Sequence, residues 1–335
     1  MISKNARYIC SMTKLLNCAS EMNRLGKQAT PFIFVIDFLA KNILVKQVNQ
    51  ISNDIILYNI NGVSNYIPED ISFNKSVFFN AIPLDPLRYR KAFEKVMKHL
   101  QRGDSYLLNL TMPVALDTNL SLLEIFKNSK AQYKLWMKDR FTVFSPEPFI
   151  RIREGRIYTY PMKGTIDASL PEAEKQLLSN QKELAEHYTI VDLLRNDLSL
   201  VADHVRVDRF RYVEELLTTK GHLLQSSSTI SGKLPSGFSS HIGDIITRLL
   251  PAGSVTGAPK KKTVEIILEV EKYDRGFYTG VFGFFDGVNL DSGVMIRFIE
   301  QTADGLVFKA GGGITVNSKP EDEYNELMQK VYLPF

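Results

Sequence analysis

Cysteine is scarce in this chain of 335 residues, which contains only Cys10 and Cys18. Two cysteines cannot build a disulfide framework or a cysteine-based zinc site, and such low usage is typical of the reducing cytoplasm. The chain also lacks any apolar run that approaches the roughly 20 residues needed to span a bilayer. These absences predict a cytoplasmic protein that has no membrane partner.

A strong charge of one sign is also missing, since the formal net charge is +4 and only 23% of the residues are charged. The single dense basic run, Lys260–Lys262, has no aromatic residues between its lysines. We interpret this run as the start of a helix, so nothing indicates a nucleic-acid partner. Repeats, low-complexity segments and Pro/Ser-rich linkers are absent as well, and we expect a single domain over residues 1–335.

The sequence predicts runs of strands with helices between the runs. Apolar, β-branched and aromatic residues predict strands at 32–38, 41–48, 54–58, 106–116, 278–286, 294–301 and 306–310. Asp85 and Pro86 predict the start of a helix that Gly103 ends, and further helices are predicted at 13–25, 172–197, 260–272 and after Pro320. This order predicts an α+β protein with large, mostly antiparallel β-sheets.

Lys163 stands out because of its neighbours in Tyr160-Pro161-Met162-Lys163-Gly164-Thr165. The proline ends a predicted strand at 156–160, and the glycine allows another group to approach the backbone closely. A lysine held between them on rigid backbone can point its amine at a ligand. A solvated lysine in a turn is the commoner explanation of such a segment taken alone.

Two predicted helices each carry a pair of glutamates three residues apart, Glu183 with Glu186 and Glu323 with Glu326. Lys330 shares a face with the second pair. Solvated, salt-bridged helix faces are the simpler explanation. Alternatively, two facing pairs could hold a hard divalent cation, and ligands that are all oxygen favour Mg²⁺ over zinc.

Three further segments suit an anionic ligand. Alternation in Val294–Ile299 predicts that Arg297 is at least partly buried, which requires either an internal carboxylate or a ligand carboxylate. Gly311-Gly312-Gly313 follows a predicted strand and forms either a bulge or a set of backbone N–H donors. The loop from Pro251 to Lys260 enters a helix N-terminus, although it lacks the Gly-Lys-Ser/Thr triplet of a nucleotide P-loop.

These segments, in this order, resemble the chorismate-utilising enzymes. The matching blocks are Ser145–Glu147, Pro161–Thr165, Ala185–His187 leading to Val191–Asp197, Ser254–Lys260, Tyr278–Gly280, Ile296-Arg297, Gly311–Ile314 and Glu323–Glu326. The resemblance runs from about Gly103 to the C-terminus. It implies antiparallel sheets packed as a sandwich with helices outside. Residues 1–102 would form a shortened N-terminal part of the sheets, and residues 103–335 would carry the catalytic core.

Within this family the chain looks most like aminodeoxychorismate synthase component I, because anthranilate synthases carry alanine where Lys163 stands here. The resemblance implies that Lys163 attacks C2 of chorismate and expels the C4 hydroxyl. Ammonia then adds at C4 and displaces the lysine, which gives 4-amino-4-deoxychorismate on the para-aminobenzoate route to folate. A lysine attacks only as the free amine, so we expect its surroundings to lower its pKa.

The resemblance also assigns the other site residues. It implies that Glu186 and Glu326 hold Mg²⁺ directly, and that Glu183 and Glu323 act beside the metal or through water. The enolpyruvyl carboxylate would be held by Arg297, Lys330, Tyr278 and the N–H groups of Gly311, Gly312 and Gly313. Gly164, Thr165 and Thr256 would line the ring.

The chain departs from the family at three places. Met162 replaces the usual isoleucine, which is a volume-conserving change. Gln225 stands where relatives often have histidine, and His222 lies three residues too early to replace it. Asn128–Gln132 replaces an Asn-Pro-Ser-Pro segment, so regulation by tryptophan is not implied.

We expect ammonia to come from a separate glutamine amidotransferase subunit, because the chain is too short to include a fused glutaminase. Alternatives are anthranilate synthase component I, isochorismate or salicylate synthase, and a catalytically idle chorismate-binding partner. Isochorismate and salicylate synthases lack a lysine at position 163. An idle partner would not need every metal and carboxylate position that this chain keeps.

Overall fold

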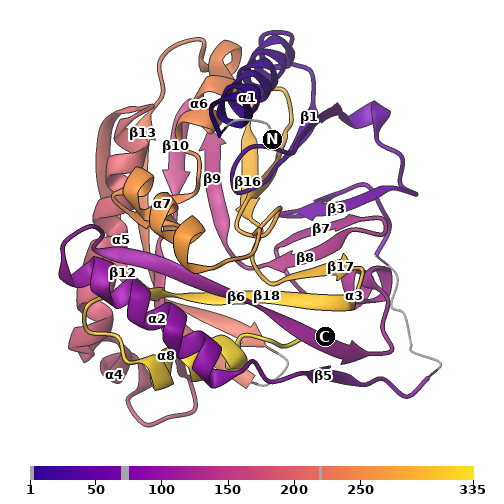
Figure 1. The fold of residues 1–335 in the computed structure, drawn as a ribbon. Coiled ribbons are helices and arrows are strands. Elements are labelled where there is room, and N and C mark those ends of the chain that lie inside the picture. The colour runs from indigo at the N-terminus through magenta and orange to yellow at the C-terminus, as the bar shows by residue number, and fades with distance from the viewer. Residues whose placement is uncertain (1–3, 69–74, 219–220) are drawn as a thin grey trace.

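Two large sheets form the centre of the computed structural model, which describes residues 4–68, 75–218 and 221–335 (Figure 1). The first sheet has the strand order β11-β13-β10-β9-β16-β15-β1-β2, with β12 paired to β13. The second has the order β14-β6-β18-β17-β8-β7-β3-β4, with β5 paired to β6. The pairs run antiparallel, as between β1 and β15 and between β6 and β18.

Strands from the first hundred residues enter both sheets. The first sheet contains β1 (Phe32–Ile36), β2 (Ile43–Gln47), β9 (Pro148–Arg153), β10 (Arg156–Thr159), β11 (Met162–Asp167), β12 (Asp203–Thr218), β13 (Gly221–Lys233), β15 (Val281–Phe285) and β16 (Leu290–Val294). The second sheet contains β3 (Ile56–Ile60), β4 (Val63–Ser64), β5 (Phe79–Ala81), β6 (Leu107–Thr118), β7 (Tyr133–Met137), β8 (Phe141–Ser145), β14 (Gly257–Ala258), β17 (Phe298–Thr302) and β18 (Gly305–Ile314).

Aromatic side chains fill the space between the two sheets. Phe282 of the first sheet and Tyr133, Phe141 and Phe298 of the second belong to one buried cluster. The rings of Phe141 and Phe298 lie 5.0 Å apart, and Phe277 packs on Phe141 at the same distance. Burying such large rings removes much apolar surface from water, which holds the two sheets face to face.

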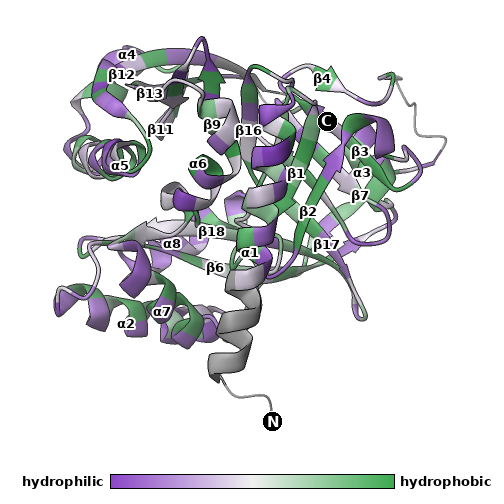
Figure 2. Cartoon of the chain, turned by 90° about the horizontal axis from the view of Figure 1, so that it is seen from above, coloured by the Kyte–Doolittle hydropathy of each residue, from purple (hydrophilic) through white to green (hydrophobic). Residues whose placement is uncertain are grey.

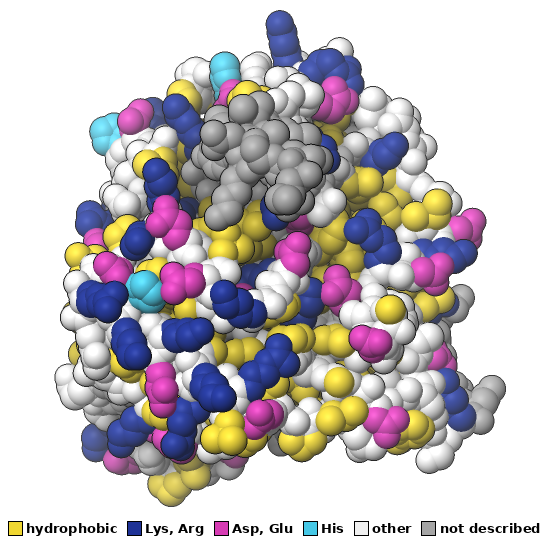
Figure 3. Space-filling model, viewed as in Figure 1, with side chains coloured by type: hydrophobic (Ala, Val, Ile, Leu, Met, Phe, Trp, Pro, Cys, Tyr) yellow, Lys and Arg dark blue, Asp and Glu magenta, His cyan; other side chains and the backbone are white. Residues whose placement is uncertain are grey.

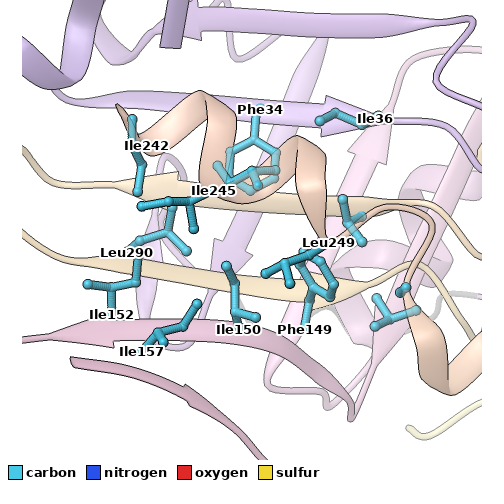
Figure 4. Packing of buried hydrophobic residues seen from close by; sticks show 14 of the residues in the cluster. Phe34, Ile36, Phe149, Ile150, Ile152, Ile157, Ile242, Ile245, Leu249 and Leu290 are labelled. Carbon is cyan, nitrogen blue, oxygen red and sulfur yellow. The ribbon is translucent and has the colours of Figure 1, made fainter. Parts of the chain in front are cut away.

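Helices cover the outer faces of both sheets (Figure 2). The first sheet is covered by α1 (Lys4–Lys27), α5 (Gln181–Ser199) and α6 (Ile242–Arg248), and the second by α2 (Pro86–Gln101), α3 (Leu122–Asn128), α7 (Lys260–Val270) and α8 (Pro320–Gln329). The remaining helical elements are α4 (Ala173–Ser179), η1 (Val48–Gln50), η2 (Phe238–His241) and η3 (Gly253–Val255). Figure 4 shows Leu249 over Phe149 and Ile245 beside Phe34, with Ile242 facing the side of the sheet that carries Leu290.

The predicted α+β fold with large antiparallel sheets and outer helices is confirmed. The predicted strand at 32–38 is the fully buried β1. Asp85 caps α2 by accepting a hydrogen bond from the Leu87 N–H at 2.9 Å, as its position before Pro86 predicts. No helix in the described ranges is both long and apolar enough to cross a membrane.

Three local predictions were wrong. The helical pattern at 172–197 is two helices, because Asn180 interrupts it and caps α5 by accepting from the Glu183 N–H at 3.1 Å. The glycines at 311–313 lie inside β18, paired to β6, rather than beyond its end. The predicted strand at 294–301 is broken, because the chain leaves the first sheet after Val294 and joins the second at Phe298.

Arg297 lies at this crossing and has a φ of +50°, in the left-handed region. Met295 and Phe298 on either side of it are fully buried. A segment that passes between two sheets is apolar on both sides, so its residue pattern resembles that of a continuous buried strand.

Candidate active site

A cavity of about 570 Å³ lies between the first sheet, α5, α8 and the far end of β18. Its wall gathers most of the residues predicted from the sequence, namely Lys163, Gly164, Thr165, Glu183, Glu186, Arg297, Gly312, Gly313, Glu326 and Lys330. They come from five segments of the chain, namely β11, α5, the crossing at Arg297, β18 and the end of α8. The remaining wall combines polar side chains, such as Asn109, Glu147, Gln225 and Ser254, with apolar ones from Phe149, Ile150, Ile190, Leu194, Leu198 and Leu249.

Four predicted residues do not line the cavity. Glu323 is buried and accepts a hydrogen bond from the Ser318 hydroxyl at 2.7 Å. Thr256 is buried and donates to the Ala252 carbonyl at 2.8 Å. Tyr278 is buried with its ring 5.9 Å from that of Phe298. The carbonyl of Gly311 accepts from the Lys330 ammonium at 3.0 Å.

Lys163 enters the cavity from an irregular stretch of β11. The pairing of β11 with β13 shifts between Met162 and Thr165, and Gly164 has a φ of +84° that favours glycine. The Lys163 ammonium lies 2.6 Å from Oε2 of Glu186, and 31% of the lysine side chain is exposed. The strand irregularity therefore aims the amine at α5.

The pKa of Lys163 is shifted in the direction opposite to the one expected from the sequence. Burial alone would lower the pKa of Lys163, but the carboxylates of Glu186, Glu326 and Glu183 outweigh burial and raise it. The expectation of a lowered pKa is thus wrong for this structure. The same carboxylates that were expected to bind a cation stabilise the ammonium form of the lysine.

The second predicted metal ligand is paired in a similar way. The Lys330 ammonium lies 2.7 Å from Oε1 of Glu326. Burial lowers the pKa of Lys330, Glu326 opposes this effect, and the cations Arg297 and Lys163 add to the lowering. Each of the two carboxylates is therefore neutralised by one lysine.

The donor atoms at this site fit a hard divalent cation by their chemistry. Within the described residues, no group of three or more His, Cys, Asp or Glu side chains is close enough to hold a metal. Glycines nevertheless keep space open beside the carboxylates. A Cβ at Gly312 would lie 3.6 Å from Oε2 of Glu323 and 3.8 Å from Oε1 of Glu326, and one at Gly164 would lie 3.1 Å from Oε2 of Glu183. Oxygen donors around such a space suit Mg²⁺.

Arg297 supplies a second cation near Lys330. Its guanidinium lies 5.2 Å from the Tyr332 ring, and its Nε is buried without a hydrogen-bond partner in the described part of the chain. A buried guanidinium N–H without an acceptor is costly. This observation favours a ligand carboxylate over the internal carboxylate that the sequence left open.

Glu147 is a cavity residue to which the sequence pattern assigned no role. Its carboxylate accepts a hydrogen bond from the Ser254 hydroxyl. Burial raises the pKa of Glu147, while Ser254, Lys330 and Arg297 act to lower it. The Ser145-Pro146-Glu147 block was the available signal, but only the folded chain places this acid opposite Lys330 and Arg297.

The structure places both His222 and Gln225, the residue that stands where relatives often have histidine. His222 is exposed and pairs with Glu215 at 2.7 Å, whereas Gln225 lies in the cavity wall, paired with Thr165 across the sheet. A different histidine, His187, is buried next to Glu186 and lies 2.7 Å from the Ser228 hydroxyl. Burial and the nearby Arg211 lower the pKa of His187 to about 4, so its ring is neutral near pH 7.

Lys260, which the sequence suggested only as a helix start, has a structural partner. Its ammonium lies 2.9 Å from Oδ2 of Asp197 and donates to the Leu249 carbonyl at 2.7 Å. These contacts tie the start of α7 to α5 and to the C-terminal end of α6. Elsewhere, Lys and Arg side chains gather on the lower left of the face in Figure 3, interspersed with acids.

Comparison with known proteins places this chain in a family. A profile of the chorismate-binding enzymes matches residues 33–334. The uncharacterised PabA-like protein of Haemophilus influenzae is 50% identical over 316 residues, which cover 94% of this chain and 95% of that protein. Aminodeoxychorismate synthase component 1 of Bacillus subtilis is 31% identical over 268 residues, which cover 75% of this chain and 56% of the relative.

The fold is also similar to that of a solved structure. The crystal structure of anthranilate synthase component I from Streptococcus pneumoniae matches with a TM-score of 0.65 at 25% identity, over 76% of this chain and 59% of that one. The chain belongs to the chorismate-binding enzyme family.

Gly312→Ala tests whether the space beside the carboxylates is the binding site. The new methyl group would meet no atom closer than 3.6 Å, so we expect the free energy of unfolding to change little. Chorismate affinity, measured by calorimetry, should fall about tenfold, which corresponds to ~1.4 kcal/mol, because the methyl group occupies the site.

Gly311→Ala is the matched comparison. Its Cβ would lie 2.4 Å from the Leu110 carbonyl oxygen, so we expect a loss of about 1–3 kcal/mol of stability from overpacking. Chorismate affinity that is unchanged in Gly312→Ala would place the ligand elsewhere.

Proposed function

We propose that the chain is an aminodeoxychorismate synthase component I, which converts chorismate and ammonia to 4-amino-4-deoxychorismate for para-aminobenzoate and folate synthesis. The observation that carries this proposal is the Lys163 amine in the cavity wall, 2.6 Å from Glu186 and at the position where the family resemblance puts the nucleophile. Anthranilate synthase is the main alternative, and alanine at this position in those enzymes argues against it.

Lys163 acts as a nucleophile in this proposal and must first lose its proton. Its nitrogen forms a bond to C2 of the ring, both ring double bonds shift, and the C4–O bond breaks. Ammonia then attacks C4, the double bonds shift back, and the C2–N bond breaks to return the lysine. Atoms balance, because one water leaves and one ammonia enters.

Glu147 is the group we propose as proton donor to the departing hydroxyl. Its raised pKa keeps a fraction of the carboxyl protonated at higher pH than an ordinary glutamate would allow. It then takes the proton that ammonia loses on attack. Ser254 holds the carboxyl in place through its hydroxyl.

The charged groups of the wall divide the two carboxylates of chorismate between them. Arg297 and Lys330, both cations of the cavity wall, would hold the enolpyruvyl carboxylate, as the family resemblance implies. Glu186 and Glu326 would hold Mg²⁺, with Glu183 and Glu323 beside them. Mg²⁺ would supply positive charge to grip the ring carboxylate. It would compete with Lys163 and Lys330 for the oxygens they now contact.

We further propose that the enzyme works in the cytoplasm with a separate glutamine amidotransferase that supplies ammonia. The similarity to aminodeoxychorismate synthase component 1 supports this partner. High ammonium would then replace the partner in vitro.

Product identity tests the proposed function directly. The purified chain, given chorismate, Mg²⁺ and ammonium, should form 4-amino-4-deoxychorismate, detected by liquid chromatography and mass spectrometry. Glutamine in place of ammonium should give no product. Anthranilate with released pyruvate, or isochorismate, would show one of the other family activities, and no turnover would indicate an idle chorismate-binding partner.

Glu186→Gln and Glu326→Gln should each abolish Mg²⁺-dependent turnover, because each removes one oxygen ligand with negative charge from the proposed metal site. Turnover over a Mg²⁺ titration and calorimetric Mg²⁺ binding provide two separate readouts. Glu174→Gln, at an exposed glutamate of α4, serves as the control and should match the unmodified chain. Normal Mg²⁺ dependence in either cavity variant would remove that glutamate from the site.

The pH profile of kcat tests the role of Glu147. The acid form donates the proton, so activity should fall as pH rises through the pKa of Glu147. Ser254 lowers that pKa, so Ser254→Ala should shift this fall to higher pH. Glu147→Gln should lose about 10²–10⁴-fold in kcat, the usual contribution of a general acid. A profile whose alkaline side is the same in Ser254→Ala would assign that side to another group.

A further inference from the structure

A fully buried ion pair lies directly behind the cavity wall. The side chains of Glu271, at the end of α7, and Arg275 are 1% and 2% exposed. The guanidinium donates to both carboxylate oxygens, from Nε at 2.8 Å and from Nη2 at 2.6 Å. It also lies over the Phe38 ring at 4.6 Å. The proposed chemistry does not use either residue.

The pair takes the place of a neighbouring strand along the edge of β6. β14 pairs with β6 at Leu107 and Leu108, and the Asn109 N–H still donates to the Thr256 carbonyl at 2.9 Å. Beyond that point the Asn109 carbonyl accepts from Nη2 of Arg275 at 2.6 Å, and the Thr111 N–H donates to Oε1 of Glu271 at 2.8 Å. The ion pair therefore continues the hydrogen bonding of the strand where its partner strand ends.

The same guanidinium reaches the loop on the other side of the wall. Its Nη1 donates to the Val255 carbonyl at 2.9 Å. Val255 follows Ser254, whose hydroxyl holds Glu147, and Asn109 and Ser254 both line the cavity. One buried side chain thus adds to the direct backbone bond between Asn109 and Thr256 in fixing these two wall segments relative to each other.

We propose that Glu271 and Arg275 are positioning residues, which hold Asn109 on β6 and the Ser254 loop in register so that Ser254 presents Glu147 to the substrate. This inference rests on the proposed function for its catalytic part. Buried ion pairs can be replaced by apolar side chains with little loss of stability. The two carbonyl bonds of Arg275 cannot be replaced in that way, so position and stability can be separated by experiment.

The double variant Glu271→Met/Arg275→Met makes that separation. We expect it to fold with a melting temperature close to that of the unmodified chain. Amide hydrogens in residues 253–258 and 107–111 should exchange faster, and kcat should fall at least tenfold with a smaller change in KM for chorismate. The variant Arg153→Met is the control. It removes an ion pair of 3.1 Å with Asp291, and its guanidinium donates to the Ile152 and Leu290 carbonyls and not to a cavity residue.

Arg275→Lys covers the case in which the double variant does not fold. A lysine keeps the charge opposite Glu271 but cannot donate to both carbonyls with a planar fork. It should therefore fold and still lose the exchange protection and the kcat. Unchanged exchange in the two wall segments, or unchanged kcat, in either folded variant overturns the proposal. Hydrogen exchange needs no turnover, so failure of the proposed function would be recognised separately, by the absence of aminodeoxychorismate from the unmodified chain.

Discussion

The contact between the Lys163 ammonium and the Glu186 carboxylate determines how the cavity can work. These groups lie 2.6 Å apart and neutralise each other, as Lys330 and Glu326 do at 2.7 Å. A carboxylate held by an ammonium is not available to a metal, and a lysine held as an ammonium cannot attack a carbon atom. Metal binding by the carboxylates and nucleophilic attack by Lys163 therefore both require that these two ion pairs open. A divalent cation at the carboxylates and a dianionic substrate at the lysines would open them together.

The charged groups that would exchange partners come from four segments that are distant in the sequence, and the fold brings these segments together at one place. Lys163 comes from an irregular stretch of β11, Glu186 from α5, and Glu326 and Lys330 from the end of the chain. The crossing of the chain from the first sheet to the second puts Arg297 at the same cavity. Behind these groups, buried contacts such as Glu271–Arg275 and Asp197–Lys260 fix the wall.

Much of the fold and of the candidate site could be predicted from the sequence, and the predictions that were wrong have a common cause. Local patterns predicted β1 and the capped start of α2, because both depend on neighbouring residues. The crossing at Arg297 was predicted as a strand, because a segment buried by two sheets has the same apolar pattern. The raised pKa of Lys163 depends on Glu183 and Glu186 in the next helix but one and on Glu326 near the other end of the sequence. Local residue spacing does not show which of these distant residues come together in space. Glu147 was missed for the same reason.

The most direct test of the account is whether chorismate becomes covalently attached to Lys163. Rapid quenching during turnover with Mg²⁺, followed by mass spectrometry, should find the peptide that contains Lys163 with the added mass of chorismate less one water. Lys163→Arg should form no adduct and should not recover activity, because a guanidinium stays protonated. Product formation by Lys163→Arg, together with no adduct in the unmodified chain, would contradict the account. It would leave Lys163 with a purely electrostatic role.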